Sequence, residues 1–172
     1  VPQNRERIYI VAFRNDIAPK EFVFPAPTDS SKTIGDIIEE KPVSARYYLS
    51  NCYLETLRRH KAHHEALGHG YEVRSLDDVA GAIVCGGMGR ERNLIVDKRQ
   101  KDLTPVTHIK GEINKEGIRK MTPREWARLQ GFPDDFVLPL ADVHLYKQFG
   151  NSVTVPVIKA IAQKIREVLD NG

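Results

Sequence analysis

The strongest constraint on the fold is a continuous apolar run at residues 8–13 (IYIVAF), which lies between charged segments near the start of the sequence. An unbroken run of β-branched and aromatic residues is typical of a strand that is covered on both faces. A chain without an initiator Met rarely opens a domain with a buried strand. We therefore expect that the chain has been cut from a longer protein or separated from a partner.

The bulk composition fits one soluble globular unit of 172 residues, 41% hydrophobic and 28% charged. No apolar run approaches the roughly 20 residues that cross a bilayer, and no signal peptide opens the chain, which predicts a cytoplasmic protein. Cys52 and Cys85 are the only cysteines. They form no CxxC motif and no zinc-type cluster, so we predict reduced thiols and no structural metal.

The charge distribution is more informative than the net charge, which is only +3. Basic residues concentrate in residues 58–61, 90–101 and 110–124. Solvated faces are the usual role of such clusters, so charge alone leaves a nucleic-acid partner open.

The first half of the chain combines a linker with one long helix. Pro19, Pro25 and Pro27 predict a linker, and residues 33–40 predict a short helix. Ser50 is a candidate N-cap for a helix over residues 51–67 that ends at Gly68. We expect its core-facing residues to be Tyr53, Leu54 and Leu57. His60 and His64 lie one turn apart, but without a third ligand they indicate a basic helix end rather than a metal site.

The second half alternates loops with short elements. Residues 81–84 and 93–96 are strand candidates on either side of the glycine-rich segment 85–92 (CGGMGRER). Thr122, Pro123 and Glu125 predict the start of a short helix through Gln130, anchored by Trp126 and Leu129. A last helix over about residues 152–169 would present one apolar face, formed by Val157, Ile158, Ile161, Ile165, Val168 and Leu169.

Three motifs occur in order: QNRER at residues 3–7, TPREWARLQGFP at 122–133 and YKQFGNSV at 146–153. Together they resemble the eighth, ninth and tenth sequence blocks of the DNA cytosine-5 methyltransferase family. Each block alone could be an ion-pair cluster, a capped helix or an ordinary loop. The resemblance covers essentially the whole chain, because the family's variable target-recognition domain lies between the eighth and ninth blocks.

The resemblance implies an α+β fold with three parts. Residues 1–15 would be an edge of a Rossmann-like catalytic domain, and residues 16–120 the target-recognition domain with its linker. Residues 121–172 would carry the ninth and tenth blocks and a C-terminal helix that returns to the catalytic domain. The implied activity is transfer of a methyl group from S-adenosylmethionine to a cytosine in a short double-stranded DNA site.

The eighth block is expected to act on the target base. Methylation inside a duplex requires that the cytosine be flipped out and held by fixed donors, together with its flanking phosphates. The resemblance assigns Gln3, Arg5 and Arg7 to the flipped cytosine and its backbone. Arg7 is favoured as the direct contact, and the alternative is that one arginine is a buried salt-bridge member.

The tenth block is expected to close the cofactor pocket through Asn151, Ser152 and Val153. A helix N-terminus with amide and hydroxyl groups suits a carboxylate, and simple N-capping of the last helix is the compatible alternative. The ninth block is expected to be structural, with Arg124 and Glu125 in internal ion pairs and Trp126 in the core.

Base reading is expected from the glycine-rich segment, where Arg90 and Arg92 could reach guanine edges in the major groove. Arg99 and Lys101 are further candidate DNA contacts. A mobile surface loop is the alternative. Whether Thr104 and Pro105, or Ala82 and Ile83, replace the family's Thr-Leu pair stays open.

The family's Pro-Cys nucleophile, FxGxG cofactor loop and Glu-Asn-Val block are absent from this sequence. We therefore predict that the chain alone is inactive and needs the N-terminal catalytic portion or subunit of the same methyltransferase. Four alternatives fit this absence: a cut fragment, the smaller subunit of a naturally split enzyme, a non-catalytic DNA-binding module and a structural domain with basic faces. FGNSV favours an enzyme part, which would associate with the nucleoid when bound to DNA. The target sequence and any partner restriction nuclease stay open.

Overall fold

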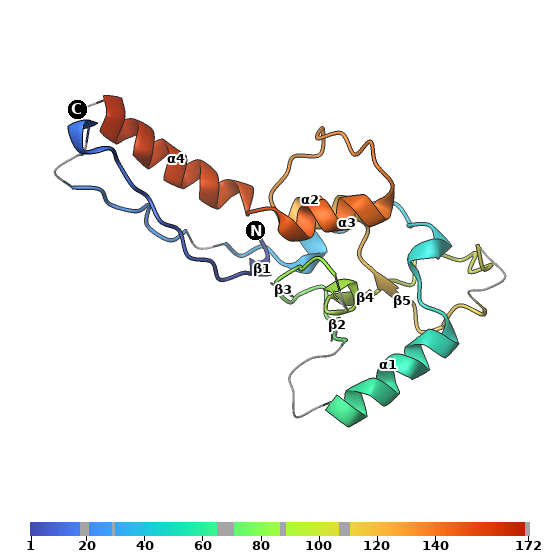
Figure 1. Cartoon of the computed structure of the whole chain (residues 1–172). Coiled ribbons are helices and arrows are strands. Elements are labelled where there is room, and N and C mark those ends of the chain that lie inside the picture. Colours follow the sequence, from blue (N-terminus) through green and yellow to red (C-terminus); the bar gives the residue numbers. More distant parts are fainter. Residues whose placement is uncertain (18–20, 29, 65–70, 87–88, 107–110, 171–172) are drawn as a thin grey trace.

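The computed structural model describes residues 1–17, 21–28, 30–64, 71–86, 89–106 and 111–170 (Figure 1). It combines α-helices with short strands. The helices are α1 (Asn51–His64), α2 (Pro123–Leu129), α3 (Asp142–Asn151) and α4 (Val155–Asp170). The strands are β1 (Gln3–Asn4), β2 (Val73–Arg74), β3 (Ala80–Gly81), β4 (Leu94–Val96) and β5 (Ile118–Lys120).

The strands form two small sheets. β1 pairs in parallel with β3, with Gln3 opposite Ala80. β4 is the central strand of the other sheet, parallel to β2 and antiparallel to β5. β4 confirms the strand predicted at residues 93–96, whereas β3 shares only Gly81 with the strand predicted at 81–84. The glycine-rich segment follows β3 and precedes β4, so it connects the two sheets.

The main core joins the middle of the chain to its C-terminal part. Its fully buried residues include Ile34, Ile83 and Ile95 together with Trp126 of α2, and α3 adds Phe149. A second cluster packs Leu54 and Leu57 of α1 against β4 and β5. α2 and α3 are thus held by residues that lie more than thirty positions earlier in the sequence.

Side-chain caps explain where two of the helices, α1 and α2, begin. The hydroxyl of Thr122 accepts a hydrogen bond from Glu125 N, and the Glu125 carboxylate accepts one from Thr122 N, which completes a capping box at the start of α2. Ser50 accepts from Tyr53 N (3.3 Å) at the start of α1. These N-termini confirm the predictions from sequence, whereas the predicted C-cap Gly68 lies outside the described residues.

The predicted strand at residues 8–13 is wrong in this structure. The segment has no strand assignment, and the side chains of Ile8 and Ile10 are 91% and 89% exposed. A doubly covered strand needs neighbouring strands for its backbone and a layer on each face. Among the described residues, β1 pairs only over Gln3–Asn4, and no strand pairs with residues 8–13.

The predicted start of the last helix is also wrong. The tenth block forms the end of α3, a helix that the sequence analysis did not anticipate, and α4 begins only at Val155. Pro156 gives the physical reason, because it has no N–H for a helical bond to the carbonyl of Ser152. The helix at residues 33–40 is likewise reduced to a 3-10 turn, Ile34–Asp36.

Within the described residues, no helix has both the length and the apolar character needed to span a membrane.

Candidate functional site

The eighth block begins with a residue that is committed to internal contacts. Gln3 Oε1 accepts a hydrogen bond from Ile83 N (3.1 Å), and Gln3 Nε2 donates to Leu129 O (3.0 Å). The Gln3 side chain thus binds the backbone just after β3 and the backbone at the end of α2. Gln3 therefore supports the site rather than facing solvent.

Arg5 is half-buried and joins three backbone carbonyls. Its Nη1 donates to Ile83 O (2.5 Å), and its Nη2 donates to Gly150 O (3.1 Å) and Ser152 O (3.0 Å). Burial lowers the pKa of Arg5, and the positive charge of Arg7 lowers it further. The guanidinium thus links the segment after β3 to the tenth block.

Arg7 differs from Gln3 and Arg5 because its side chain is exposed. Its Nη1 donates to the carbonyl of the adjacent Glu6 (2.6 Å). Of the three residues assigned to the target base, the structure therefore places Gln3 and Arg5 in internal contacts and leaves Arg7 accessible to a ligand.

The tenth block lies at the C-terminal end of α3 and not at a helix N-terminus. Asn151 is the last residue of α3, and its Oδ1 accepts a hydrogen bond from Cys85 Sγ (2.7 Å). Ser152 Oγ donates back to Phe149 O (3.0 Å). The expectation of donors at the start of the last helix is therefore corrected, and so is the alternative that these residues cap it.

Gly150 shows how closely the two segments approach. A Cβ atom at this position would lie 2.5 Å from Cys85 N. Only glycine permits this contact without a shift of the backbone. The glycine-rich segment and the tenth block therefore touch directly.

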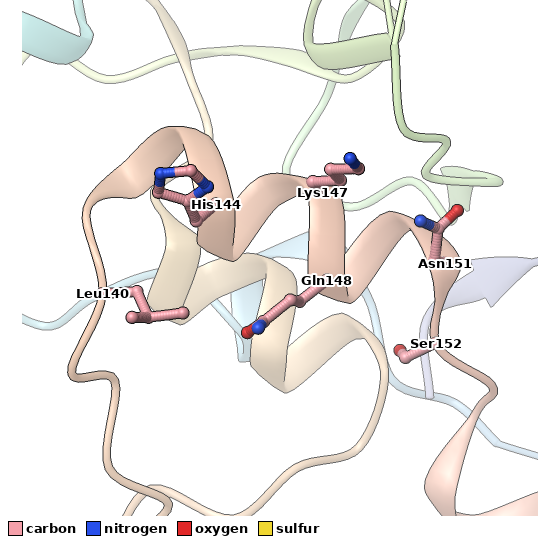
Figure 2. A pocket seen from close by; sticks show the side chains of 6 residues that line it. All are labelled: Leu140, His144, Lys147, Gln148, Asn151 and Ser152. Atoms are coloured by element: carbon pink, nitrogen blue, oxygen red, sulfur yellow. The ribbon is translucent and has the colours of Figure 1, made fainter.

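An open hollow of about 630 Å³ lies along one face of α3 (Figure 2). Asn151 and Ser152 line its end, and His144, Lys147, Gln148 and Leu140 line the rest. His144 and Lys147 are not among the site residues predicted from the sequence. The helical spacing of Leu145, Tyr146 and Phe149 could have indicated α3 and hence a shared face for residues 144, 147, 148 and 151.

A second, smaller pocket of about 300 Å³ lies between α3 and the glycine-rich segment. Arg90 and Lys147 are its basic lining residues, and the Arg90 guanidinium carbon lies 5.6 Å from the ring centroid of Tyr146. Burial raises the pKa of Tyr146, whose hydroxyl donates to Met121 O (2.5 Å). Arg90 therefore lies over the buried ring of the first residue of the tenth block.

The four candidate DNA-contacting residues have different surroundings. Arg90 and Lys101 are exposed and Arg92 is half-buried. Arg99 is committed to the protein, because it forms an ion pair with Asp97 (2.8 Å) and donates to Glu39 O and Glu40 O. The structure brings Arg90 to the site and holds Arg99 in an internal network.

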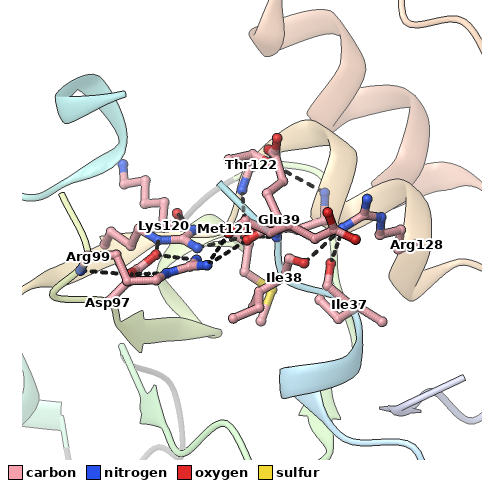
Figure 3. A network of polar contacts seen from close by, with 12 residues as sticks. Ile37, Ile38, Glu39, Asp97, Arg99, Lys120, Met121, Thr122 and Arg128 are labelled. Atoms are coloured by element: carbon pink, nitrogen blue, oxygen red, sulfur yellow. Dashed lines mark hydrogen bonds and ion pairs between the residues drawn. The ribbon is translucent and has the colours of Figure 1, made fainter. Parts of the chain in front are cut away.

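The network around Asp97 and Arg99 is drawn in Figure 3. It also contains Arg119, which is fully buried. It forms ion pairs with Asp97 (3.0 Å) and with Glu125 (2.7 Å). Burial alone would raise the pKa of Asp97, but hydrogen bonds from Arg99 and the charge of Arg119 hold it well below its usual range. The predicted internal role of Glu125 is visible here, whereas Arg124 donates to Pro133 O and Phe136 O.

Among the described residues, no group of three or more His, Cys, Asp or Glu side chains could hold a metal ion.

Comparison with solved structures defines the class of fold. The Dnmt2 methyltransferase of S. pombe aligns with a TM-score of 0.59 at 21% identity, over 83% of this chain and 44% of that chain. The Entamoeba histolytica methyltransferase EhMeth gives a TM-score of 0.59 at 16% identity, over 90% and 45%. The chain therefore has the fold of part of a methyltransferase.

Sequence comparison then gives the family. A sequence model for C-5 cytosine-specific DNA methylases matches residues 1–167, so the chain belongs to that family, as its three motifs predicted. The Type II methyltransferase M.HpaII of Haemophilus parainfluenzae is 60% identical over 99% of this chain and 48% of its own length. M.SsoII of Shigella sonnei is 41% identical over 99% and 42%. The chain thus spans less than half of these relatives.

Proposed function

We propose that this chain is the DNA-recognition and cofactor-closing part of a DNA (cytosine-5)-methyltransferase, which methylates cytosine in a short duplex site. The observation that carries the proposal is the junction of the eighth block, the glycine-rich segment and the tenth block around Arg5. Residues 1–15 would complete the edge of the Rossmann-like domain, residues 16–120 would form the recognition domain, and residues 121–172 would return the chain to the catalytic domain.

In this proposal Arg7 holds the flipped cytosine and its flanking phosphate. Its exposure and positive charge support this role, because phosphate oxygens and the polar edge of cytosine both accept hydrogen bonds from a guanidinium. Gln3 and Arg5 would support the segment from which Arg7 projects. Their side chains already satisfy backbone groups inside the fold.

Asn151, Ser152 and Val153 are proposed to close over S-adenosylmethionine, which supplies the methyl group. The residues along the hollow fit such a cofactor, because the Asn151 amide and the Lys147 ammonium are suitable donors for its carboxylate. Val153 is 44% exposed and offers an apolar contact.

DNA reading is proposed for Arg90 and Arg92, with Lys101 on a phosphate. Arg90 is exposed next to the proposed cofactor side, which suits a residue that reads bases close to the flipped cytosine. Arg99 has five hydrogen bonds to Asp97, Glu39 and Glu40, so we assign it to the fold instead.

The proposed partner is the N-terminal catalytic portion of the same methyltransferase, on one chain or as a separate subunit. This chain contains no Pro-Cys pair and so lacks the family nucleophile. The exposed Ile8 and Ile10 are suitable side chains for burial against that portion. In a bacterial cell the assembled enzyme would act in the cytoplasm, on the nucleoid.

The test compares the 172-residue chain with a joined protein, in which the chain follows the N-terminal portion of M.HpaII. Incorporation of tritium from labelled S-adenosylmethionine into plasmid DNA is measured, and bisulfite sequencing maps the methylated site. We expect methylation by the joined protein and none by the chain alone. Cytosine methylation by the chain alone, or none by a folded joined protein, would contradict the proposal.

A further inference from the structure

Arg5 connects segments that are far apart in the sequence. Its three carbonyl partners belong to Ile83, 78 residues away, and to Gly150 and Ser152, 145 and 147 residues away. The first precedes the glycine-rich segment that contains Arg90, and the other two flank Asn151. One guanidinium therefore touches both the proposed base-reading segment and the proposed cofactor segment.

The two carbonyls in the tenth block need a donor because the helix ends there. The last carbonyls of any helix have no N–H partner within that helix. Pro156 also removes the N–H that would otherwise continue to Ser152 O in a longer helix. Arg5 supplies these missing donors, with help from Gln130 Nε2, which donates to Phe149 O (2.8 Å).

Two further contacts close the same junction. Cys85 Sγ donates to Asn151 Oδ1 (2.7 Å), and the backbone of Cys85 leaves no room for a side chain at Gly150. The segment that follows Ile83 is therefore fixed in position relative to the turn at residues 150–152. A change at Arg5 would release both segments together.

We propose that Arg5 is a positioning residue that fixes the glycine-rich segment relative to the turn at residues 150–152. Base discrimination and cofactor binding would then both depend on the Arg5 side chain. The inference rests on the proposed function. It differs from a direct contact of Arg5 with the flipped cytosine, which would act on the chemical step.

The test uses the joined protein with Arg5→Lys, because lysine keeps the charge but cannot span three carbonyls. We expect KM for S-adenosylmethionine to rise about tenfold and discrimination against single-base variants of the mapped site to fall about tenfold, as the loss of one charged hydrogen bond implies. The turnover number should change by a smaller factor than either of these two quantities, since Arg5 contacts only backbone carbonyls and no reacting atom.

Arg128→Lys is the matched control. Arg128 also donates to two backbone carbonyls, Ile37 O (3.2 Å) and Ile38 O (2.9 Å), but these lie in neither segment. This variant should lower the melting temperature and leave KM and base discrimination unchanged. If Arg5→Lys behaves in the same way, the role of Arg5 is merely structural and the inference is overturned.

Two other outcomes are informative. A large loss of turnover with unchanged KM and discrimination would overturn the inference in favour of direct contact with the base. If Arg5→Lys fails to fold, Cys85→Ala tests the same junction, with a smaller joint change expected in both constants and Cys85→Ser as its conservative control. Unchanged constants in Cys85→Ala would then overturn the inference. Failure of the proposed function is distinguished by the unmodified joined protein, which would not methylate DNA.

Discussion

Arg119 holds a positive charge where no water can reach it, and its two carboxylate partners, Asp97 and Glu125, are also buried. Glu125 further accepts from Thr122 N at the start of α2, so one carboxylate serves both the ion pair and the helix cap. The interaction joins β5 to α2 and to Asp97, which directly follows β4. Loss of one member leaves charges that cannot be solvated, which costs far more than loss of an exposed pair.

Arg119→Met should therefore destabilise the joined protein by about 3–5 kcal/mol, because Glu125 remains buried without its counterion and Asp97 keeps only its ion pair with Arg99. Arg58→Met is the control, since Arg58 pairs with Glu116 at 48% and 52% exposure. That change should cost at most about 1 kcal/mol. Urea unfolding of both variants measures the difference, and equal costs would contradict the importance of burial.

The depressed pKa of Asp97 predicts how stability depends on pH. Because the folded-state pKa lies below the ordinary value of 3.8, this carboxylate contributes its full stability above that value and loses it as the pH falls toward the folded-state pKa. Asp97→Asn should be less stable at pH 7 but should lose less stability on further acidification below about pH 4. Parallel slopes for Asp97→Asn and the unmodified protein in acid unfolding would contradict this prediction.

At the scale of elements, the sequence predicted helices that carry local end signals and failed where the boundary depends on distant contacts. Thr122, Pro123 and Gly131 mark both ends of α2, and Ser50 marks the start of α1. α3 has no side-chain cap at Ala141, so its start left no comparable signal. Residues 8–13 follow a strand pattern, but no neighbouring strand lies among the described residues.

For the candidate site, the sequence predicted which residues belong to it but not which distant residues they contact. The motifs identified Gln3, Arg5 and Arg7 as one group, but their division into two supports and one exposed side chain depends on carbonyls supplied by residues 83, 129, 150 and 152. Arg99 resembled its basic neighbours in sequence. Its ion pair with Asp97 and its bonds to Glu39 and Glu40 come from the folded arrangement.

The glycine-rich segment gives a prediction of its own. In the joined protein, Arg90→Ala or Arg92→Ala should reduce discrimination at one base pair by about 1–3 kcal/mol, because a bidentate contact to guanine is lost. Lys101→Ala should instead weaken binding to all DNA sequences alike and lower the salt dependence of binding. Competition binding against single-base variants separates these outcomes, and a uniform loss of affinity in both arginine variants would assign them to phosphates.

At the scale of the whole molecule, the described chain has a packed centre and an apolar periphery. α2 and α3 lie at the centre, whereas α4 projects away from them and has only Ile161 buried (Figure 1). Val157, Ile158 and Leu169 of α4 are partly exposed, like Ile8 and Ile10. An exposed apolar area of this kind is typical of a surface that another part of the protein covers.

Ile8→Asp together with Ile10→Asp should weaken assembly of the chain with a separately expressed N-terminal portion by at least about tenfold, because each buried isoleucine contributes about 1.5–3 kcal/mol. The same change should reduce self-association of the chain alone. Val137→Asp, at a side chain that is 73% exposed, is the control and should change neither property. Sedimentation of the mixed portions measures assembly, and unchanged assembly in the double variant would contradict this prediction.

The long sequence separation of the Arg5 contacts has a consequence for synthesis. Gly150 and Ser152 leave the ribosome 145 and 147 residues after Arg5, which at roughly 5–20 residues per second takes on the order of 10 s. During that interval Arg5 lacks two of its three carbonyl partners, and the apolar residues beside it are already exposed. We therefore expect this junction to close only after residues 150–152 have been synthesised, and residues 8–13 would be open to a chaperone that protects the nascent chain during that interval.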